Sequence, residues 1–146
     1  MEKVYSKEIL EGIKKKFPNV EIKVHSPRRT YLKIEREKVY EFAHYLFKEL
    51  GFRLSIATGI DTRDGIEILY HFSDDGAGTY YTIKTVVPKD DLKIKSLADF
   101  LTAANWIERE IHELLGVEFV GHPNLVPLLT PEDWPEATYP LRRDYE

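Results

Sequence analysis

The chain contains no cysteine among its 146 residues. This absence excludes disulfide bonds, zinc sites with thiolate ligands, cysteine nucleophiles and iron–sulfur clusters held by cysteine. If the protein belongs to a redox complex, we therefore expect other chains of that complex to carry the electrons. The lack of cysteine, the single methionine and the many lysine and glutamate residues also fit a thermophilic protein.

The sequence has no hydrophobic run long enough to cross a membrane, and its first residues lack the apolar core of a signal peptide. If the protein works at a membrane, something else must hold it there. The formal net charge is −4, and the short basic run Lys14 to Lys16 falls at the end of a predicted helix, where cations are favourable. Nucleic-acid-binding proteins usually have a basic face, so we expect no nucleic-acid partner.

Hydrophobic periodicity predicts an α+β fold in the order helix, two strands, helix, three strands. Helical spacing is found in 7–16, with Ser6 as the expected N-terminal cap, and in 37–50, with Gly51 as the expected C-terminal cap. Alternation of apolar and polar residues predicts five strands: 20–25, 31–35, 54–58, 66–72 and 79–87. Short turns join most of them, so we expect a mostly antiparallel sheet with helices on one face.

Two short helices are predicted after the last strand. Ser96 with Asp99, and Asn105 with Glu108, both have the spacing of a capping box at a helix N-terminus. The second helix is expected to end at Gly116.

The character of the sequence changes after this helix, because residues 117–146 contain five of the eight prolines. We expect extended chain there, and its many apolar residues need a surface to cover them. We therefore predict an α+β domain at 1–116 and an extended C-terminal docking segment of the same domain at 117–146.

The helix that ends at Gly116 combines an apolar line with a dense cluster of charges. The apolar line consists of Ile107, Ile111, Leu114 and Leu115. The charged residues form pairs four positions apart, Glu108 with His112 and Arg109 with Glu113, which predicts an amphipathic helix with two ion pairs on its polar side. Each pair would be worth about 0.2–0.5 kcal/mol if exposed.

Two other interpretations of this region remain open at this point. Glu108, His112 and His122 have side chains that bind zinc or iron, which would fit a stand-alone metal-dependent hydrolase. Against this, Arg109 places a permanent cation between the ligands, and no HExxH, GxSxG, P-loop or GxGxxG motif is present. The other alternative is a free-standing interaction domain whose tail binds an unrelated partner.

The run AANWIEREIHELLGVEFVGHPNL, followed by PLRRDY, resembles the signature of the 30-kDa subunit family of respiratory complex I, which also occurs in membrane-bound nickel–iron hydrogenases and related complexes. The matching positions are Glu108 to Glu110, Glu113 to Gly116, Gly121 to Pro123 and Pro140 to Asp144. The chain departs from the pattern at Val126-Pro127, where the family often has a basic pair, at Thr138-Tyr139 in place of Gly-His, and at Arg143 in place of Lys. These departures suggest a divergent branch, such as the archaeal or hydrogenase-type versions.

The resemblance implies a non-catalytic, cofactor-free hydrophilic subunit that docks on the large catalytic subunit in the peripheral arm. It also implies a small iron–sulfur subunit as a partner, indirect contact with membrane subunits, and a place on the cytoplasmic side of the membrane. Iron–sulfur clusters, and a nickel–iron centre in hydrogenase-type complexes, would lie in the partner subunits. The residues that this interpretation assigns to partner docking are Glu108, Arg109, Glu110, His122, Pro123, Trp134, Arg142, Arg143 and Asp144.

Overall fold

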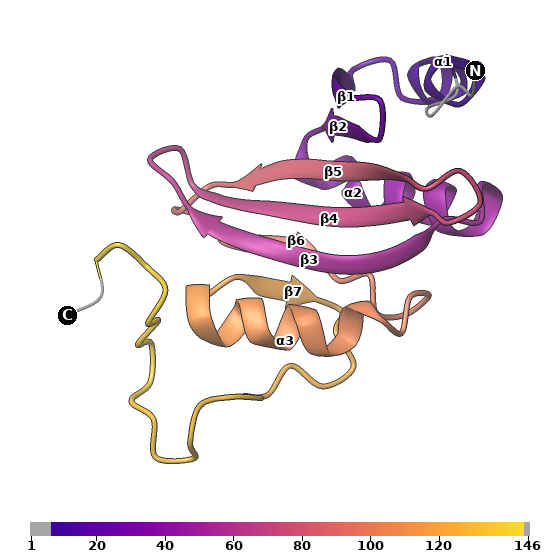
Figure 1. Ribbon diagram of the computed structural model, residues 1–146. Coiled ribbons are helices and arrows are strands. Elements are labelled where there is room, and N and C mark those ends of the chain that lie inside the picture. Colours follow the sequence, from indigo (N-terminus) through magenta and orange to yellow (C-terminus); the bar gives the residue numbers. More distant parts are fainter. Residues whose placement is uncertain (1–6, 145–146) are drawn as a thin grey trace.

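The computed structural model describes residues 7–144, and Ser6, the expected cap of the first helix, lies outside them. A five-stranded sheet in the order β1-β2-β5-β4-β3 forms the centre, and a two-stranded sheet, β6-β7, lies beside it (Figure 1). The elements are, in chain order, α1 (Lys7–Lys16), β1 (Glu21–Ser26), β2 (Arg29–Lys33), α2 (Arg36–His44), the π-helical turn η1 (Tyr45–Glu49), β3 (Arg53–Asp61), β4 (Ile66–Asp74), β5 (Thr79–Val87), β6 (Lys93–Lys95), α3 (Ala104–Leu115) and β7 (Glu118–Val120).

The predicted α+β fold with a mostly antiparallel sheet is confirmed. β1 and β2 form an antiparallel hairpin, and β3, β4 and β5 form an antiparallel meander. The two parts are joined by β2 and β5, which pair in parallel because α2 crosses over between β2 and β3. The sequence pattern did not predict this parallel pair, the order of the strands or the second sheet, β6-β7.

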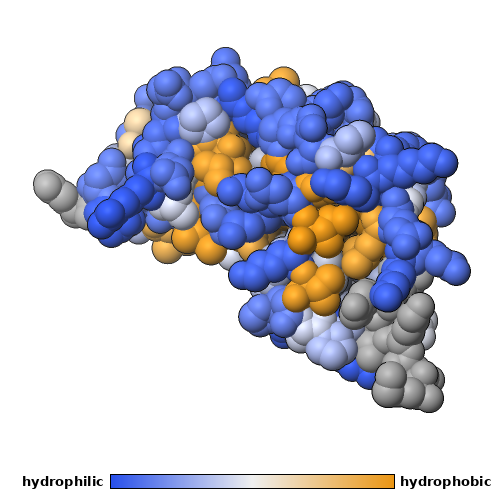
Figure 2. Space-filling view, turned by 90° about the horizontal axis from the view of Figure 1, so that it is seen from above, coloured by the Kyte–Doolittle hydropathy of each residue, from blue (hydrophilic) through white to orange (hydrophobic). Residues whose placement is uncertain are grey.

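All three helices contribute to a single core on one face of the sheet. Ile13 of α1, Phe42 of α2 and Ile111 of α3 belong to the same buried cluster as Tyr70 of β4 and Ile83 of β5. The alternating side chains of the same strands point to the opposite face, which is more polar, as expected of an antiparallel sheet with one face toward solvent. Seen from above, the surface is mainly hydrophilic, with small hydrophobic areas between polar side chains (Figure 2).

The two predicted capping boxes are wrong. Residues 97–100 form a turn instead of a helix, in which Leu101 donates its N–H to the carbonyl of Leu97 at 2.9 Å. Helix α3 begins at Ala104, and its N-cap, Ala103, makes no side-chain cap hydrogen bond. The Ser96 hydroxyl accepts from the N–H of Ala98 at 3.0 Å, within the turn, and donates to the Glu108 carboxylate at 3.1 Å.

The first residues of the predicted docking segment lie inside the fold. β7 pairs in parallel with β6, and the side chains of Val117 and Phe119 are 0% and 1% exposed. The alternation of apolar and polar residues over 117–119 is the signal of a strand, although it is too short to stand out in the sequence. The irregular part of the segment therefore starts at Gly121.

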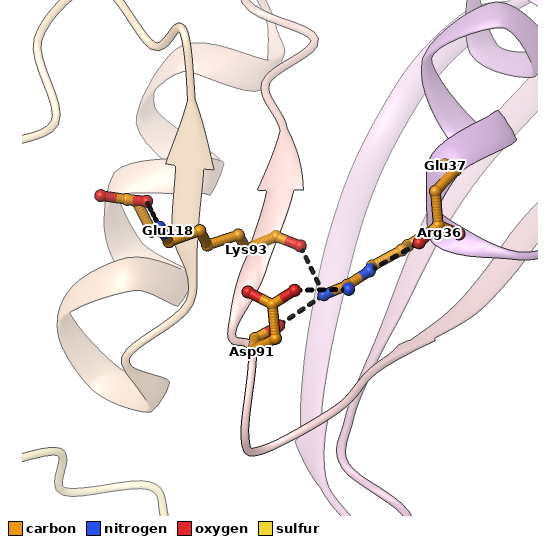
Figure 3. A network of polar contacts seen from close by, with 5 residues as sticks. All are labelled: Arg36, Glu37, Asp91, Lys93 and Glu118. Carbon is orange, nitrogen blue, oxygen red and sulfur yellow. Dashed lines mark hydrogen bonds and ion pairs between the residues drawn. The ribbon is translucent and has the colours of Figure 1, made fainter.

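Arg36, the first residue of α2, binds the connection between β5 and β6 to this helix (Figure 3). Its guanidinium donates to the carbonyl oxygens of Asp91 and Lys93 and forms an ion pair with the Asp91 carboxylate at 2.7 Å. Lys93 in turn lies 3.8 Å from Glu118 of β7. This network positions β6, and through it β7, at the start of the tail.

Helix α3 packs closely against β3 at Gly59. A Cβ atom at this position would lie 2.5 Å from Cδ1 of Leu115 and 3.2 Å from Cγ2 of Ile111, both of which are buried. The absence of a side chain at Gly59 therefore allows the helix to approach the sheet, which fixes the position of the charged residues on its other sides. No helix within residues 7–144 is long and apolar enough to cross a bilayer.

We predict that Gly59→Ala lowers the free energy of unfolding by about 1–3 kcal/mol, because the added methyl overpacks the contact with Leu115 and Ile111. Urea unfolding of the purified protein measures the change. The matched control is Gly12→Ala, where the nearest atom lies at an ordinary 3.5 Å. This control should raise stability by about 0.5–1 kcal/mol through helix propensity, and equal effects of the two substitutions would contradict the packing argument.

Candidate functional site

The site predicted from the sequence lies on and around α3, whose sides have different roles. Ile111 and Leu115 face the sheet and are buried, as the apolar line predicts. The expected ion pairs of Glu108 with His112 and of Arg109 with Glu113 do not form. Each of these four side chains instead contacts a segment outside the helix.

Glu108 points into the core and is 0% exposed. Its Oε1 accepts hydrogen bonds from the hydroxyl of Ser96 at 3.1 Å and from the backbone N–H of Leu97 at 2.9 Å. Burial raises the pKa of the Glu108 carboxyl from 4.5 to about 8, although these two hydrogen bonds favour the charged form. Glu108 thus ties α3 to the turn after β6 and exposes no surface to a partner.

The phenol of Tyr70, on strand β4, is also buried. Its hydroxyl makes no hydrogen bond within residues 7–144. Burial, and to a smaller extent the charge of Glu108, raises the pKa of Tyr70 well above 10. Charging Glu108 would therefore place an anion in a core that already holds an unpaired polar group.

Arg109 and Glu113 hold the tail by its backbone. The Arg109 guanidinium donates to the carbonyl oxygens of Val126 and Pro127, both at 2.9 Å. The Glu113 carboxylate accepts from the backbone N–H groups of Leu128, at 2.8 Å, and of the two residues that follow. Two side chains one helical turn apart thus fix five successive residues, 126–130.

Four hydrogen bonds determine the charge state of Glu113. Burial alone would raise the pKa of this carboxyl, but the backbone N–H groups of Leu129, Leu128 and Thr130, together with the Thr130 hydroxyl, hold it below its usual value. Glu113 is therefore an anion at neutral pH, as its three backbone donors require.

The two histidines of the predicted metal site are bonded to different parts of the backbone. His122 accepts from the N–H of Asn124 at Nδ1, so its Nε2 carries the proton that is donated to the carbonyl of Asn105 at 2.8 Å. His112 bonds through Nδ1 to the carbonyl of Val117 at 2.8 Å. His122 joins the start of the tail to the N-terminal end of α3, and His112 stabilises the turn into β7.

The chain returns to the other end of α3 at the PLRRDY motif. Leu141 donates its N–H to the carbonyl of Leu114 at 3.0 Å, and Nε of Arg142 donates to the carbonyl of Leu115 at 2.7 Å. The Arg142 guanidinium lies 4.4 Å from the ring centre of Tyr139. These bonds satisfy carbonyl groups at the C-terminal end of a helix, where a cation is also favoured by the helix dipole.

Gly116 makes room for this return. Its φ of 83° is the left-handed conformation expected of a helix C-cap, and a Cβ there would lie 2.4 Å from Nη2 of Arg142. The predicted end of the helix is confirmed, and the same glycine also provides space for the tail.

Asp61, at the end of β3, is a tail-binding residue that the sequence analysis missed. Its carboxylate accepts from the N–H of Arg143 at 2.8 Å and pairs with Lys89 at 2.7 Å, and its side chain is only 2% exposed. Lys89, and next the Arg143 N–H, lower its pKa. No pattern in the sequence links these residues, because Asp61 looks like an ordinary turn residue.

The tail and α3 expose several large apolar side chains. Trp106, Leu129, Leu141 and Val126 are 68%, 61%, 58% and 43% exposed. We call these four residues the apolar strip. The sequence analysis did not include Trp106 among the docking residues. Its position outside the apolar line of α3 was the signal that its side chain would be exposed.

The residues predicted to dock a partner fall into different environments. Glu110, Pro123, Arg143 and Asp144 are exposed. Trp134 is half-buried, and its indole N–H donates to the carbonyl of Thr138 at 2.9 Å. Glu108, Arg109, His122 and Arg142 instead hold the fold and the tail in place. Their assignment to a partner contact stays a prediction, although for Glu108 the complete burial argues for an indirect role.

The chain forms a small α+β domain with an extended tail bound against its last helix. Within residues 7–144, no three His, Asp or Glu side chains come together in a group that could hold a metal. The chain belongs to the family described as the 30-kDa subunit of the respiratory-chain NADH dehydrogenase, whose model matches residues 32–146.

Relatives of the chain include subunits of several complexes. It is 36% identical to a subunit of the F420H2 dehydrogenase of Methanosarcina mazei, covering 94% of this chain and 90% of that protein. It is 33% identical to the beta subunit of the membrane-bound hydrogenase of Pyrococcus furiosus, covering 93% and 83%. A chain in the structure of the membrane-bound sulfane sulfur reductase, an archaeal respiratory membrane complex, superposes with a TM-score of 0.82 at 27% identity, covering 95% and 84%.

These comparisons confirm the expected family and contradict the stand-alone hydrolase. The three side chains proposed as its ligands, Glu108, His112 and His122, bond to separate backbone groups, as described above. The relatives are subunits of multi-subunit complexes, which fits a chain whose folded surface carries a fixed apolar tail.

We predict that the stability of the fold depends on the proton of Glu108. Folding raises the pKa of Glu108 to about 8, so the folded state binds its proton more tightly than the unfolded state. The stability that this proton provides is fully present below pH 4.5 and is lost as the pH rises through 8. Between these values the free energy of unfolding should fall by up to about 1.4 kcal/mol per pH unit. Glu108→Gln, which stays neutral, should remove that slope in urea unfolding between pH 6 and 9, whereas Glu110→Gln, at an exposed position, should keep it.

We also predict that Glu113→Gln releases the tail, because an amide is a weaker acceptor than a carboxylate and its NH2 group faces backbone donors. Limited proteolysis should cut 126–131 at least several-fold faster than in the parent chain, with the domain intact. Because folding lowers the pKa of Glu113, the parent tail should itself become susceptible only as the pH falls below the ordinary value of 4.5. Equal cleavage of Glu113→Gln and the exposed control Glu110→Gln would contradict this role.

Proposed function

We propose that the chain is a non-catalytic, cofactor-free subunit of a membrane-bound energy-converting oxidoreductase. In this role it docks on the large catalytic subunit in the peripheral arm, next to a small iron–sulfur subunit. Its family and its relatives in the F420H2 dehydrogenase and the membrane-bound hydrogenase support this proposal. The absence of cysteine supports a role outside the electron path, with iron–sulfur clusters, and any nickel–iron centre, in the partner subunits.

The observation that carries the proposal is the way the tail is held. Arg109 and Glu113 bind the backbone of 126–130 and leave the side chains of Val126 and Leu129 exposed. A segment fixed by its backbone has already lost most of its conformational entropy, so a partner that covers its side chains need not provide that free energy. A tail that only closed the core of its own domain would turn its apolar side chains inward.

The apolar strip has the composition of a protein interface. Tryptophan is strongly enriched among the residues that dominate binding, and Trp106 is the most exposed large apolar side chain of the described residues. Exposed charges flank the strip at Glu110, Arg143 and Asp144. Arginine suits bidentate pairing with a carboxylate, so these charges would set the orientation of the docked subunit.

The proposed location rests on the relatives, which include a subunit of a membrane-bound hydrogenase and a chain of an archaeal respiratory membrane complex. The described residues include no membrane-spanning helix. We propose that the subunit lies at the cytoplasmic side of the membrane, attached through its partner subunits and in contact with the membrane subunits only through them. The electron transfer and the coupled ion translocation would take place in those other chains.

We predict that truncation after Gly121 abolishes co-purification with the large subunit and leaves the domain folded, because β7 and the core residues Val117 and Phe119 are kept. The measurement is a tagged pull-down from detergent-solubilised membranes, with the bound chains identified by mass spectrometry. Survival of the complete complex after this truncation would rule out the docking role of the tail.

Point substitutions separate docking from folding. Trp106→Ala combined with Leu129→Asp should reduce the recovered large subunit at least tenfold without changing the unfolding transition, since both side chains are exposed. Val24→Asp, at an exposed position of β1, is the control and should leave recovery unchanged. If the protein is found alone in the soluble fraction with a stoichiometric metal, the subunit assignment itself is wrong.

A further inference from the structure

Strand β3 forms one edge of the five-stranded sheet and is unusual for an edge strand. It is nine residues long, and between Arg53 and Asp61 it has the sequence LSIATGI, with no charged residue and no proline. Soluble proteins usually protect long edge strands with charges, prolines or a covering segment, because the free N–H and C=O groups invite another strand to pair. Among the residues described, β3 has a bulge near Leu54 and the packing of α3 at Gly59 as protection, and neither pairs with its backbone.

The opposite edge of the same sheet is protected. β1 has six residues, and Glu21, Lys23 and His25 occupy alternate positions along it. The difference matters because both edges belong to one sheet and face the same solvent. One edge is built to stay unpaired, whereas the other is not.

The backbone of β3 is open toward the edge. Within residues 7–144, no backbone hydrogen bond joins the outer side of 54–60 to another segment. Ile56 and Ile60 are 54% and 45% exposed, and Thr58 between them is exposed as well. The ends are fixed, because Arg53 pairs with Asp75 at 2.9 Å and Asp61 pairs with Lys89 at 2.7 Å.

We infer that the edge of β3 binds an extended strand of the partner subunit, which adds to the sheet as a sixth strand. This inference rests on the proposed function, in which the chain works inside a complex. Strand addition would satisfy the open N–H and C=O groups of 54–60 with backbone bonds. The added strand would need small or β-branched apolar side chains at alternate positions, opposite Ile56, Thr58 and Ile60, and no charge between them.

The position of β3 identifies the occupant as the subunit that covers the tail. Helix α3 packs on β3 at Gly59, and Asp61 at the end of β3 binds Arg143 of the tail. The edge of β3, α3 and the tail therefore lie on one side of the molecule, the lower side in Figure 1.

Edge substitutions test the site. The double substitution Ile56→Lys and Ile60→Lys places two charges on exposed positions, as natural edge strands do, so the fold should remain intact. In the tagged pull-down from solubilised membranes, we expect recovery of the large subunit to fall at least tenfold. Val24→Lys, on the protected edge, is the matched control and should show full recovery. Full recovery with the double variant would overturn the inference.

Amide hydrogen exchange distinguishes strand addition from simple apolar contact. In the complex purified through this subunit, alternate amides of 54–60 should exchange at least tenfold more slowly than in the isolated chain, because only backbone pairing protects every second N–H. Unchanged exchange in an intact complex would overturn strand addition and leave the proposed function standing. Slow exchange of the same amides in the isolated chain, together with the mass of a dimer, would show that a second copy of this chain occupies the β3 edge. That result would also overturn the inference. Failure of the parent chain to enter any complex would instead refute the proposed function.

Discussion

The hydrogen bonds from Arg109 and Glu113 to the backbone of 126–130 are the interaction on which the rest of the surface depends. Two charges of opposite sign lie one helical turn apart and are satisfied by backbone dipoles of opposite direction, carbonyls for the arginine and N–H groups for the glutamate. Their mutual ion pair would have been worth little on an exposed helix. Because Arg109 and Glu113 bind the backbone of the tail instead, they fix the position of the irregular segment 126–130. The side chains of Val126 and Leu129 remain exposed.

This arrangement requires that α3 cannot move. Glu108 holds the helix to the turn after β6 through Ser96 and Leu97, and the lack of a side chain at Gly59 lets the helix lie close to β3. His122 and Arg142 bind the tail at the two ends of the same helix. The charged residues on and around α3 are thus divided into those that face the core, those that bind the tail and those that face solvent.

The fold class followed from local periodicity, because each strand of the meander and each amphipathic helix has its own pattern. The parallel pairing of β2 with β5 did not, since it depends on the path of a crossover helix. At the site, the family resemblance located α3 and the tail, but spacing paired Glu108 with His112 and Arg109 with Glu113. In the structure the tail provides better partners for Arg109 and Glu113, and the turn after β6 does so for Glu108. Asp61 was unpredictable for the same reason: its partner Arg143 is 82 residues away in the sequence.

The central claim is that the tail is already in place before a partner binds. Hydrogen exchange of the isolated chain at neutral pH tests it most directly, at the amides of Leu128, Leu129 and Thr130, which donate to Glu113. The account predicts clear protection of these amides, with fast exchange at the neighbouring exposed residues Glu132 and Asp133. Exchange at the rate of an unstructured peptide at all three positions would contradict it, because the tail would then be ordered only by its partner.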